Sequence, residues 1–296
     1  MFATSFRRIW VFAAAAVVAA MVLAATASQP VASGPAAPAA SAGQPRVAVT
    51  TSWLECALRD VAGDRFAVTR LCPPGSCPGH FDVTPGAARE LGASSFVLMF
   101  DFQSGMADRL RGLSGADGGA PAMLTMTGPK SMCTPDNYGS VCRDLADALV
   151  RDGHLARPDA DRAVSAVEAR LAALSTELRD AVTSAGLAGV PVVASHHQEG
   201  FCRWLGLDPV AAFASGEMNS PSALAAVVEK GRAGRVRLVV GNQQEGRQAA
   251  DALARQLGVP VVVFSNFPAL TPDEPTYDAL LRRNLDALLS AVPPRP

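Results

Sequence analysis

Residues 71–85, LCPPGSCPGHFDVTP, bring two cysteines, a histidine and an acid into one short stretch. Thiolate and imidazole groups bind zinc and copper(I), so Cys72, Cys77 and His80 have the chemistry of a soft-metal site. The two cysteines could instead form a disulfide, which we favour if the chain is exported. His80 and Asp82 are then the candidate metal ligands of this segment, and the surrounding proline and glycine would hold the loop rigid.

A second group of candidate ligands occurs in residues 192–207, VVASHHQEGFCRWLGL, where two histidines follow an apolar run. Imidazole is the commonest metal ligand near neutral pH. In open α/β sheets, ligands bind at the carboxyl ends of the strands, and both His80 and His196 follow β-branched runs. That position favours His196 as a ligand, whereas His197 could be a surface residue of the first helical turn. The two segments together predict a metal site.

The elements that must position these residues follow a repeated pattern from Arg46 onward. Short β-branched runs alternate with helix patterns, which predicts mainly parallel sheets covered on both faces. One long helix pattern, from Pro158 to Ala185, interrupts this alternation and has no internal glycine or proline. We therefore predict an α/β fold with two lobes, each a mainly parallel sheet flanked by helices, joined by one long rigid helix. The expected boundaries are 46–155, 156–186 and 187–296.

The first residues of the chain predict export. Arg7 and Arg8 precede an apolar run that ends in Ala25-Thr26-Ala27, so residues 1–27 are interpreted as a signal peptide and 28–45 as a flexible linker. Cleavage is favoured over retention as an N-terminal anchor, because the run is rich in alanine and ends in a cleavage pattern. The expected location is periplasmic or otherwise extracytoplasmic.

Composition limits the partners and the redox chemistry. The formal net charge of −1, with scattered signs, provides no basic stripe and excludes a typical nucleic-acid binder. The six cysteines are interpreted for an oxidising compartment. This predicts one disulfide between Cys72 and Cys77 and another between Cys133 and Cys142.

The lobe–helix–lobe order and two segments resemble the zinc- and manganese-binding solute receptors of ABC importers. VAGDRFAVTRLCPPGSCPGHFDVTP looks like the first-ligand segment of that family, and VVASHHQEGFCRWLGL looks like the later segment in which a strand ends in Ser-His. The places of the first segment are filled here by His80, Phe81, Asp82, Thr84 and Pro85. The resemblance implies a monomer with no enzymatic activity. It would capture a divalent metal ion, zinc in particular, between its lobes and deliver it to the membrane subunit of the importer.

The chain departs from this family at two expected ligand positions. Lys130 stands where the family has a histidine, and a lysine ammonium has no lone pair to donate. Asn266 stands where the family has a carboxylate, and an amide oxygen is a poorer zinc ligand. A four-ligand cage therefore does not carry over intact.

Three alternatives remain open. Neighbours in the cleft could complete the metal site; the candidates are Asp82, His197, Gln198, Glu199, and Gln243 and Gln244 of the VVGNQQEG segment. The same fold could instead bind a metal chelate or a small organic ligand through hydrogen bonds from Lys130, Gln243, Gln244 and Asn266. A secreted hydrolase built on Ser195-His196 or Cys202 is less favoured, because no G-x-S-x-G motif is present.

Overall fold

The structure, a computed structural model, describes residues 43–292 except 74, 75, 77, 80, 114–120 and 215–219. The predicted signal peptide and nearly all of the predicted linker therefore lie outside the described residues. None of the helices in the described ranges is long and apolar enough to cross a membrane.

The N-terminal lobe contains a four-stranded parallel sheet of order β2-β1-β3-β4. The central strands form because their side chains are apolar and buried on both faces, as in FVLMF of β3. The strands are β1 (Arg46–Val49), β2 (Ala67–Arg70), β3 (Phe96–Phe100) and β4 (Ala122–Met126). The helical elements are α2 (Ser52–Ala62), α3 (Pro85–Gly92), η1 (Asp101–Gln103), α4 (Ser104–Leu113) and α5 (Pro135–Arg151).

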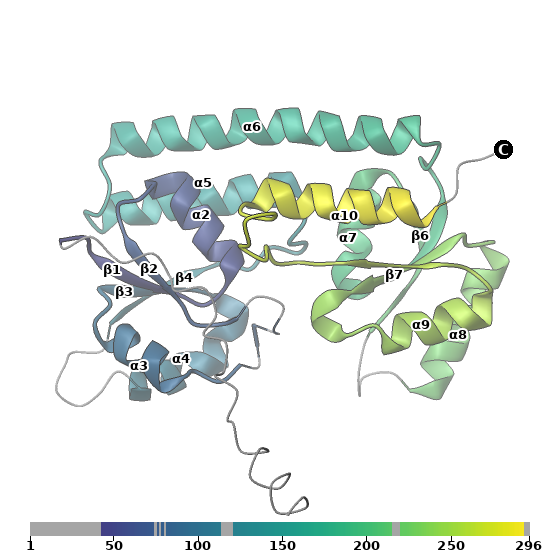
Figure 1. Cartoon of the computed structure of the whole chain (residues 1–296), viewed down its shortest axis with the longest axis horizontal. Helices are drawn as coiled ribbons and strands as arrows, with labels where there is room; N and C mark the ends of the chain where they lie inside the picture. Colours follow the sequence, from purple (N-terminus) through teal and green to yellow (C-terminus); the bar gives the residue numbers. More distant parts are fainter. Residues whose placement is uncertain are drawn as a thin grey trace, which may run out of the picture. The chain divides into compact units, whose positions relative to one another are not determined.

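The C-terminal lobe repeats this arrangement with a second parallel sheet, of order β6-β5-β7-β8 (Figure 1). Its strands are β5 (Pro191–Ser195), β6 (Asp208–Phe213), β7 (Leu238–Asn242) and β8 (Val261–Phe264). Its helical elements are α7 (His196–Leu205), α8 (Pro221–Ala233), η3 (Gln243–Glu245), α9 (Gln248–Leu257) and α10 (Tyr277–Ala291). Since β5, β7 and β8 are neighbours, the segments that follow them meet at one edge of the sheet.

Helix α6 (Arg157–Ser184) runs along both lobes (Figure 1). It packs against α2 and α5 of the first lobe and against α7 and α10 of the second. Its buried stripe consists of Ala160, Val167, Leu171, Leu174, Leu178 and Val182, and the partly buried Val164 packs against the same core, so apolar positions recur every three or four residues. The predicted fold class, two α/β lobes joined by one long helix, is confirmed.

The lobes share one hydrophobic core at their junction. The rings of Tyr138 on α5 and Tyr277 on α10 stack with their centroids 3.8 Å apart, and Trp53 of α2 packs edge-on against both. Arg170 of α6 places both terminal nitrogens on the carboxylate of Asp60, at 2.8 and 2.6 Å. The helices of the two lobes are thus joined by continuous packing as well as by the chain itself.

The predicted Cys133–Cys142 disulfide is wrong, because both residues are buried free thiols. Cys133 precedes α5, whereas Cys142 lies well inside it. The helical rise alone separates Pro135 from Cys142 by about 10 Å, and a disulfide requires Cα atoms within about 7 Å. The Cys133 thiol instead donates to the carbonyl oxygen of Ser265, 3.1 Å away in the other lobe. Cys77 lies outside the described residues, so the Cys72–Cys77 disulfide stays a prediction.

Candidate functional site

Both predicted histidines of the C-terminal lobe lie at the carboxyl end of β5, where they begin α7. The helix begins at His196 because the Ser195 hydroxyl caps it by accepting from the His197 backbone N–H. The imidazoles are 60% and 62% exposed for His196 and His197. Both rings are therefore accessible to a ligand.

Each histidine has a carboxylate close by. His197 Nε2 lies 3.6 Å from Oε1 of Glu245, which follows β7 in the short helix η3. His196 Nδ1 lies 3.9 Å from Oε2 of Glu199, one turn along α7. Glu245 is not among the residues predicted from the sequence, although it directly follows the predicted Gln243 and Gln244. The available signal was an acid at the end of a strand that pairs with the histidine-bearing strand.

Ser195 connects these groups. Its hydroxyl donates to Oε2 of Glu245 across 2.6 Å, so the carboxylate is held in place from the base of the site. Glu245 is only 17% exposed, compared with the open imidazole of His197. One carboxylate oxygen is thus held by Ser195 while the other faces the histidine.

A group of buried amide side chains lies beside this pair. Gln198 Nε2 donates to Oδ1 of Asn242, at 3.1 Å, and to Oδ1 of Asn266, at 2.9 Å. Gln244 accepts from the Asn266 backbone N–H through Oε1 and donates to the Ser265 hydroxyl through Nε2, each at 3.0 Å. The structure therefore brings the predicted residues Gln244 and Asn266 together, with their amide oxygens already accepting hydrogen bonds.

The remaining predicted side chains of the site are exposed. Lys130 follows β4 at the surface, and Gln243 is exposed at the start of η3. The Asp82 carboxylate is fully exposed and pairs with Arg109 of α4 at 3.4 Å. Within the described ranges, no three His, Cys, Asp or Glu side chains are grouped to hold a metal ion. Their ligand roles stay predictions.

His80, the first predicted ligand, lies outside the described residues, but parts of its loop are described. Gln103 Nε2 donates to the Pro78 carbonyl across 2.8 Å. A cavity of about 10 Å³, enough for one water molecule, lies between this loop and Phe267 of the other lobe. Its lining consists of Thr51, Ser52, Cys72, Pro73, Ser76, Pro78 and Phe267. The described part of the loop thus lies at the junction of the lobes.

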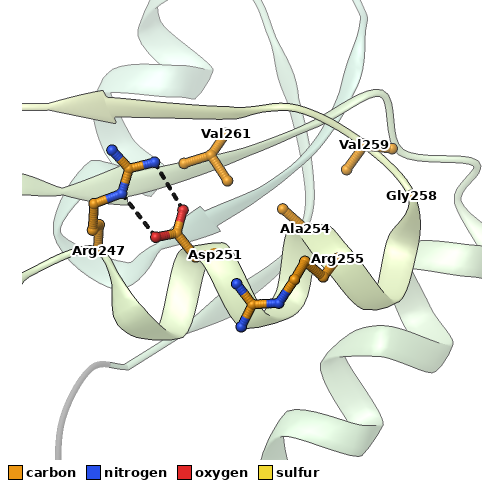
Figure 2. Close-up of a pocket in the computed structure, with 7 residues that line it drawn as sticks. All are labelled: Arg247, Asp251, Ala254, Arg255, Gly258, Val259 and Val261. Atoms are coloured by element: carbon orange, nitrogen blue, oxygen red, sulfur yellow. Dashed lines mark hydrogen bonds and ion pairs between the residues drawn. The ribbon is translucent and has the colours of Figure 1, made fainter.

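A larger groove, of about 420 Å³, lies elsewhere, beside α9 and the start of β8 (Figure 2). Arg247 and Asp251, one turn apart at the start of α9, lie side by side in its lining and form two hydrogen bonds of 2.8 and 2.9 Å. Because Arg247 and Asp251 pair with each other and none of the lining residues is a predicted ligand, we do not assign the site to this groove.

Comparison with known proteins places the chain in a family. The family model described as "ZnuA: Zinc-uptake complex component A periplasmic" matches residues 47–291. The chain belongs to this family. Among curated proteins, none matches the chain by sequence.

Solved structures of this kind share the fold. A crystal structure of ZnuA has a TM-score of 0.67 at 15% identity, covering 84% of this chain and 99% of that one. A cadmium-bound periplasmic metal-binding protein from Candidatus Liberibacter asiaticus has a TM-score of 0.66 at 14% identity, covering 83% and 99%. The solute-binding protein FpvC from P. aeruginosa, in complex with Ni²⁺, has a TM-score of 0.65 at 18% identity, covering 84% and 97%. The zinc-uptake family and its fold thus agree with the resemblance found in the sequence.

Proposed function

We propose that this chain is an extracytoplasmic receptor that captures a divalent metal ion, zinc in particular, and delivers it to the membrane subunit of an ABC importer. The observation that carries the proposal is the pair of accessible imidazoles, His196 and His197, at the strand end of a chain matched by the zinc-uptake family over residues 47–291. Export by a cleaved signal peptide, residues 1–27, belongs to the same proposal.

The proposed ligands are His80, His196 and His197, with Asp82 as a further oxygen donor from the first lobe. The two departures from the family concern ligand positions of this same expected site. Lys130 carries no lone pair, and the Asn266 amide oxygen accepts a hydrogen bond from Gln198. The cage proposed here therefore differs from a complete four-ligand site.

Two features weigh against a hydrolase. The hydroxyl of Ser195 donates its hydrogen to Glu245 and not to an imidazole, so Ser195-His196 is not arranged as a nucleophile and its base. Cys202 is fully buried, and this burial raises the pKa of its thiol, which opposes formation of the reactive thiolate. These contacts support a binding role.

A second candidate is the same fold carrying a metal chelate or a small organic ligand. The specific observation is the lack, within the described ranges, of any grouping of three metal-binding side chains. A chelate would bring its own donor atoms and would need hydrogen bonds from the protein, for which Lys130, Gln243, Gln244 and Asn266 are the candidates.

Elemental analysis of the purified chain, followed by thermal melting with added divalent ions, tests the proposal. Zinc should raise the melting temperature, because it would bind the folded protein and not the unfolded chain. His80→Ala should retain the fold and lose this stabilisation. If zinc, manganese, cobalt, nickel and copper all leave the melting temperature unchanged, the free-metal receptor is contradicted and the chelate or organic-ligand candidate takes its place.

A further inference from the structure

The spacing of His197 and Glu245 matches two adjacent ligands of a metal ion. Zinc–nitrogen and zinc–oxygen bonds of about 2.0–2.2 Å at a tetrahedral angle place two donor atoms about 3.4 Å apart. The observed separation of His197 Nε2 and Glu245 Oε1 is 3.6 Å. The two atoms can therefore bind one ion after a movement of a few tenths of an ångström.

Ser195 prepares the carboxylate for this role. Its 2.6 Å hydrogen bond to Oε2 restrains the orientation of Glu245 and leaves Oε1 toward the imidazole. In metal sites, a carboxylate that binds the ion usually also accepts a hydrogen bond from a neighbouring protein group. This bond fixes the carboxylate before the ion arrives, so less conformational entropy is lost on binding. Ser195 also accepts from the backbone of His197, so one hydroxyl contacts both residues of the pair.

The other histidine–carboxylate pair of this helix is less suited to the role. Oε1 of Glu199 already lies 2.8 Å from the guanidinium of Arg203, which offsets its negative charge. Its second oxygen is 3.9 Å from His196 Nδ1, farther than two ligands of one zinc ion would lie. Among the described residues, Glu245 forms an ion pair with His197 alone and with no arginine or lysine.

We infer that His197 and Glu245 form the metal-ligand pair of the C-terminal lobe, positioned by Ser195, for a divalent cation that prefers nitrogen and oxygen donors. Glu245 thereby supplies, from the segment after β7, the negative charge that Asn266 does not supply after β8. This inference rests on the proposed function only in that the chain must bind a divalent metal ion.

The test measures zinc affinity of the mature chain by competition with a chromophoric chelator, in the wild type and in single variants. Glu245→Gln keeps the size of the side chain and an oxygen for the Ser195 hydroxyl but removes the charge. It should weaken zinc binding at least tenfold, as should His197→Ala, and Ser195→Ala should weaken it about 10- to 100-fold. Glu199→Gln, which removes the carboxylate beside His196, is the matched control and should bind zinc as the wild type does.

Two further measurements separate ligation from a structural effect. The melting temperature without metal should stay close to that of the wild type in Glu245→Gln, His197→Ala and Glu199→Gln, whereas Ser195→Ala also loses the cap of α7 and should melt lower. With Co²⁺ in place of zinc, the visible absorption of the bound ion should change in Glu245→Gln and stay unchanged in Glu199→Gln. If the wild type binds zinc and Glu245→Gln binds it equally well, the inference is wrong and the proposed function stands. If the wild type binds no divalent ion, both are wrong.

Discussion

Gln198 donates a hydrogen bond from Nε2 to Oδ1 of Asn266 across 2.9 Å, and both side chains are buried. The bond joins the first turn of α7 to the segment after β8, and so connects the two strand ends at which a metal site is expected. Buried amides need such partners, because a lost hydrogen bond in the interior costs about 1–3 kcal/mol. Asn266 thus has a structural role at the position where the sequence resemblance implies a carboxylate.

Asn266→Asp should restore that carboxylate without removing the contact, since an aspartate oxygen still accepts from Gln198. Zinc affinity should rise at least tenfold relative to the wild type. Stability without metal should fall by about 1–3 kcal/mol at neutral pH, because an added charge is buried. Chelator competition and chemical denaturation measure the two quantities. Unchanged zinc affinity in a folded variant would show that position 266 lies outside the metal site.

The thiols of Cys133 and Cys142 should be found unlinked to each other in a non-reduced digest analysed by mass spectrometry. Burial raises the pKa of both thiols, so alkylation should be slow in the native protein and fast after unfolding. The same digest tests the predicted Cys72–Cys77 disulfide. A peptide joining Cys133 to Cys142 would contradict the helix register that separates them.

Asp278 should make the protein less stable as the pH rises. Burial raises the pKa of its carboxyl, and although Arg170 at 3.3 Å opposes this, nearby Asp60 reinforces it. Because the pKa is raised in the folded protein, the carboxyl of Asp278 loses its proton at a lower pH in the unfolded chain than in the folded one. The contribution of Asp278 to the free energy of unfolding therefore declines as the pH rises from the ordinary carboxyl range through the folded-state pKa. Asp278→Asn should therefore gain stability relative to the wild type between pH 3.5 and pH 7, measured by urea unfolding.

Glu177→Gln is the control, because its stability relative to the wild type should change with pH in the opposite direction. Its hydrogen bonds with Arg282 lower the pKa of Glu177, so its contribution is present above the unfolded-state pKa and is lost on acidification. The variant should lose stability relative to the wild type as pH rises, by no more than about 1 kcal/mol because both partners are half exposed. Equal pH profiles for the two variants would contradict this assignment.

The sequence was sufficient for the fold class because the buried central strands and the α6 stripe have clear apolar periods. It did not predict β4, an edge strand that is only partly buried, AMLTM, nor α4, which has few apolar positions. The site was less predictable. The sequence places His196 and His197 correctly because they follow directly on a strand. It does not show which carboxylate lies beside them, since that depends on the parallel pairing of β5 with β7. No local pattern encodes the 3.6 Å approach of His197 and Glu245.

Metal binding should leave the radius of gyration of the protein unchanged within error in solution scattering. The lobes share a continuous apolar core, and α6 contacts helices of both lobes along its length. Wide closure would have to break this packing, including the stacked rings of Tyr138 and Tyr277. Recognition would then depend on local loops more than on hinge rotation between lobes.

Leu171→Pro tests whether α6 provides this restraint. Leu171 is buried in the middle of the helix, and proline there removes a backbone hydrogen bond and clashes with the preceding turn, at a cost of about 3 kcal/mol or more. If the variant still folds, its radius of gyration should respond to metal more than that of the wild type. A large fall in the radius of gyration of the wild type on metal binding would contradict the restraint by α6. An intact helix packed on both lobes does not permit wide closure.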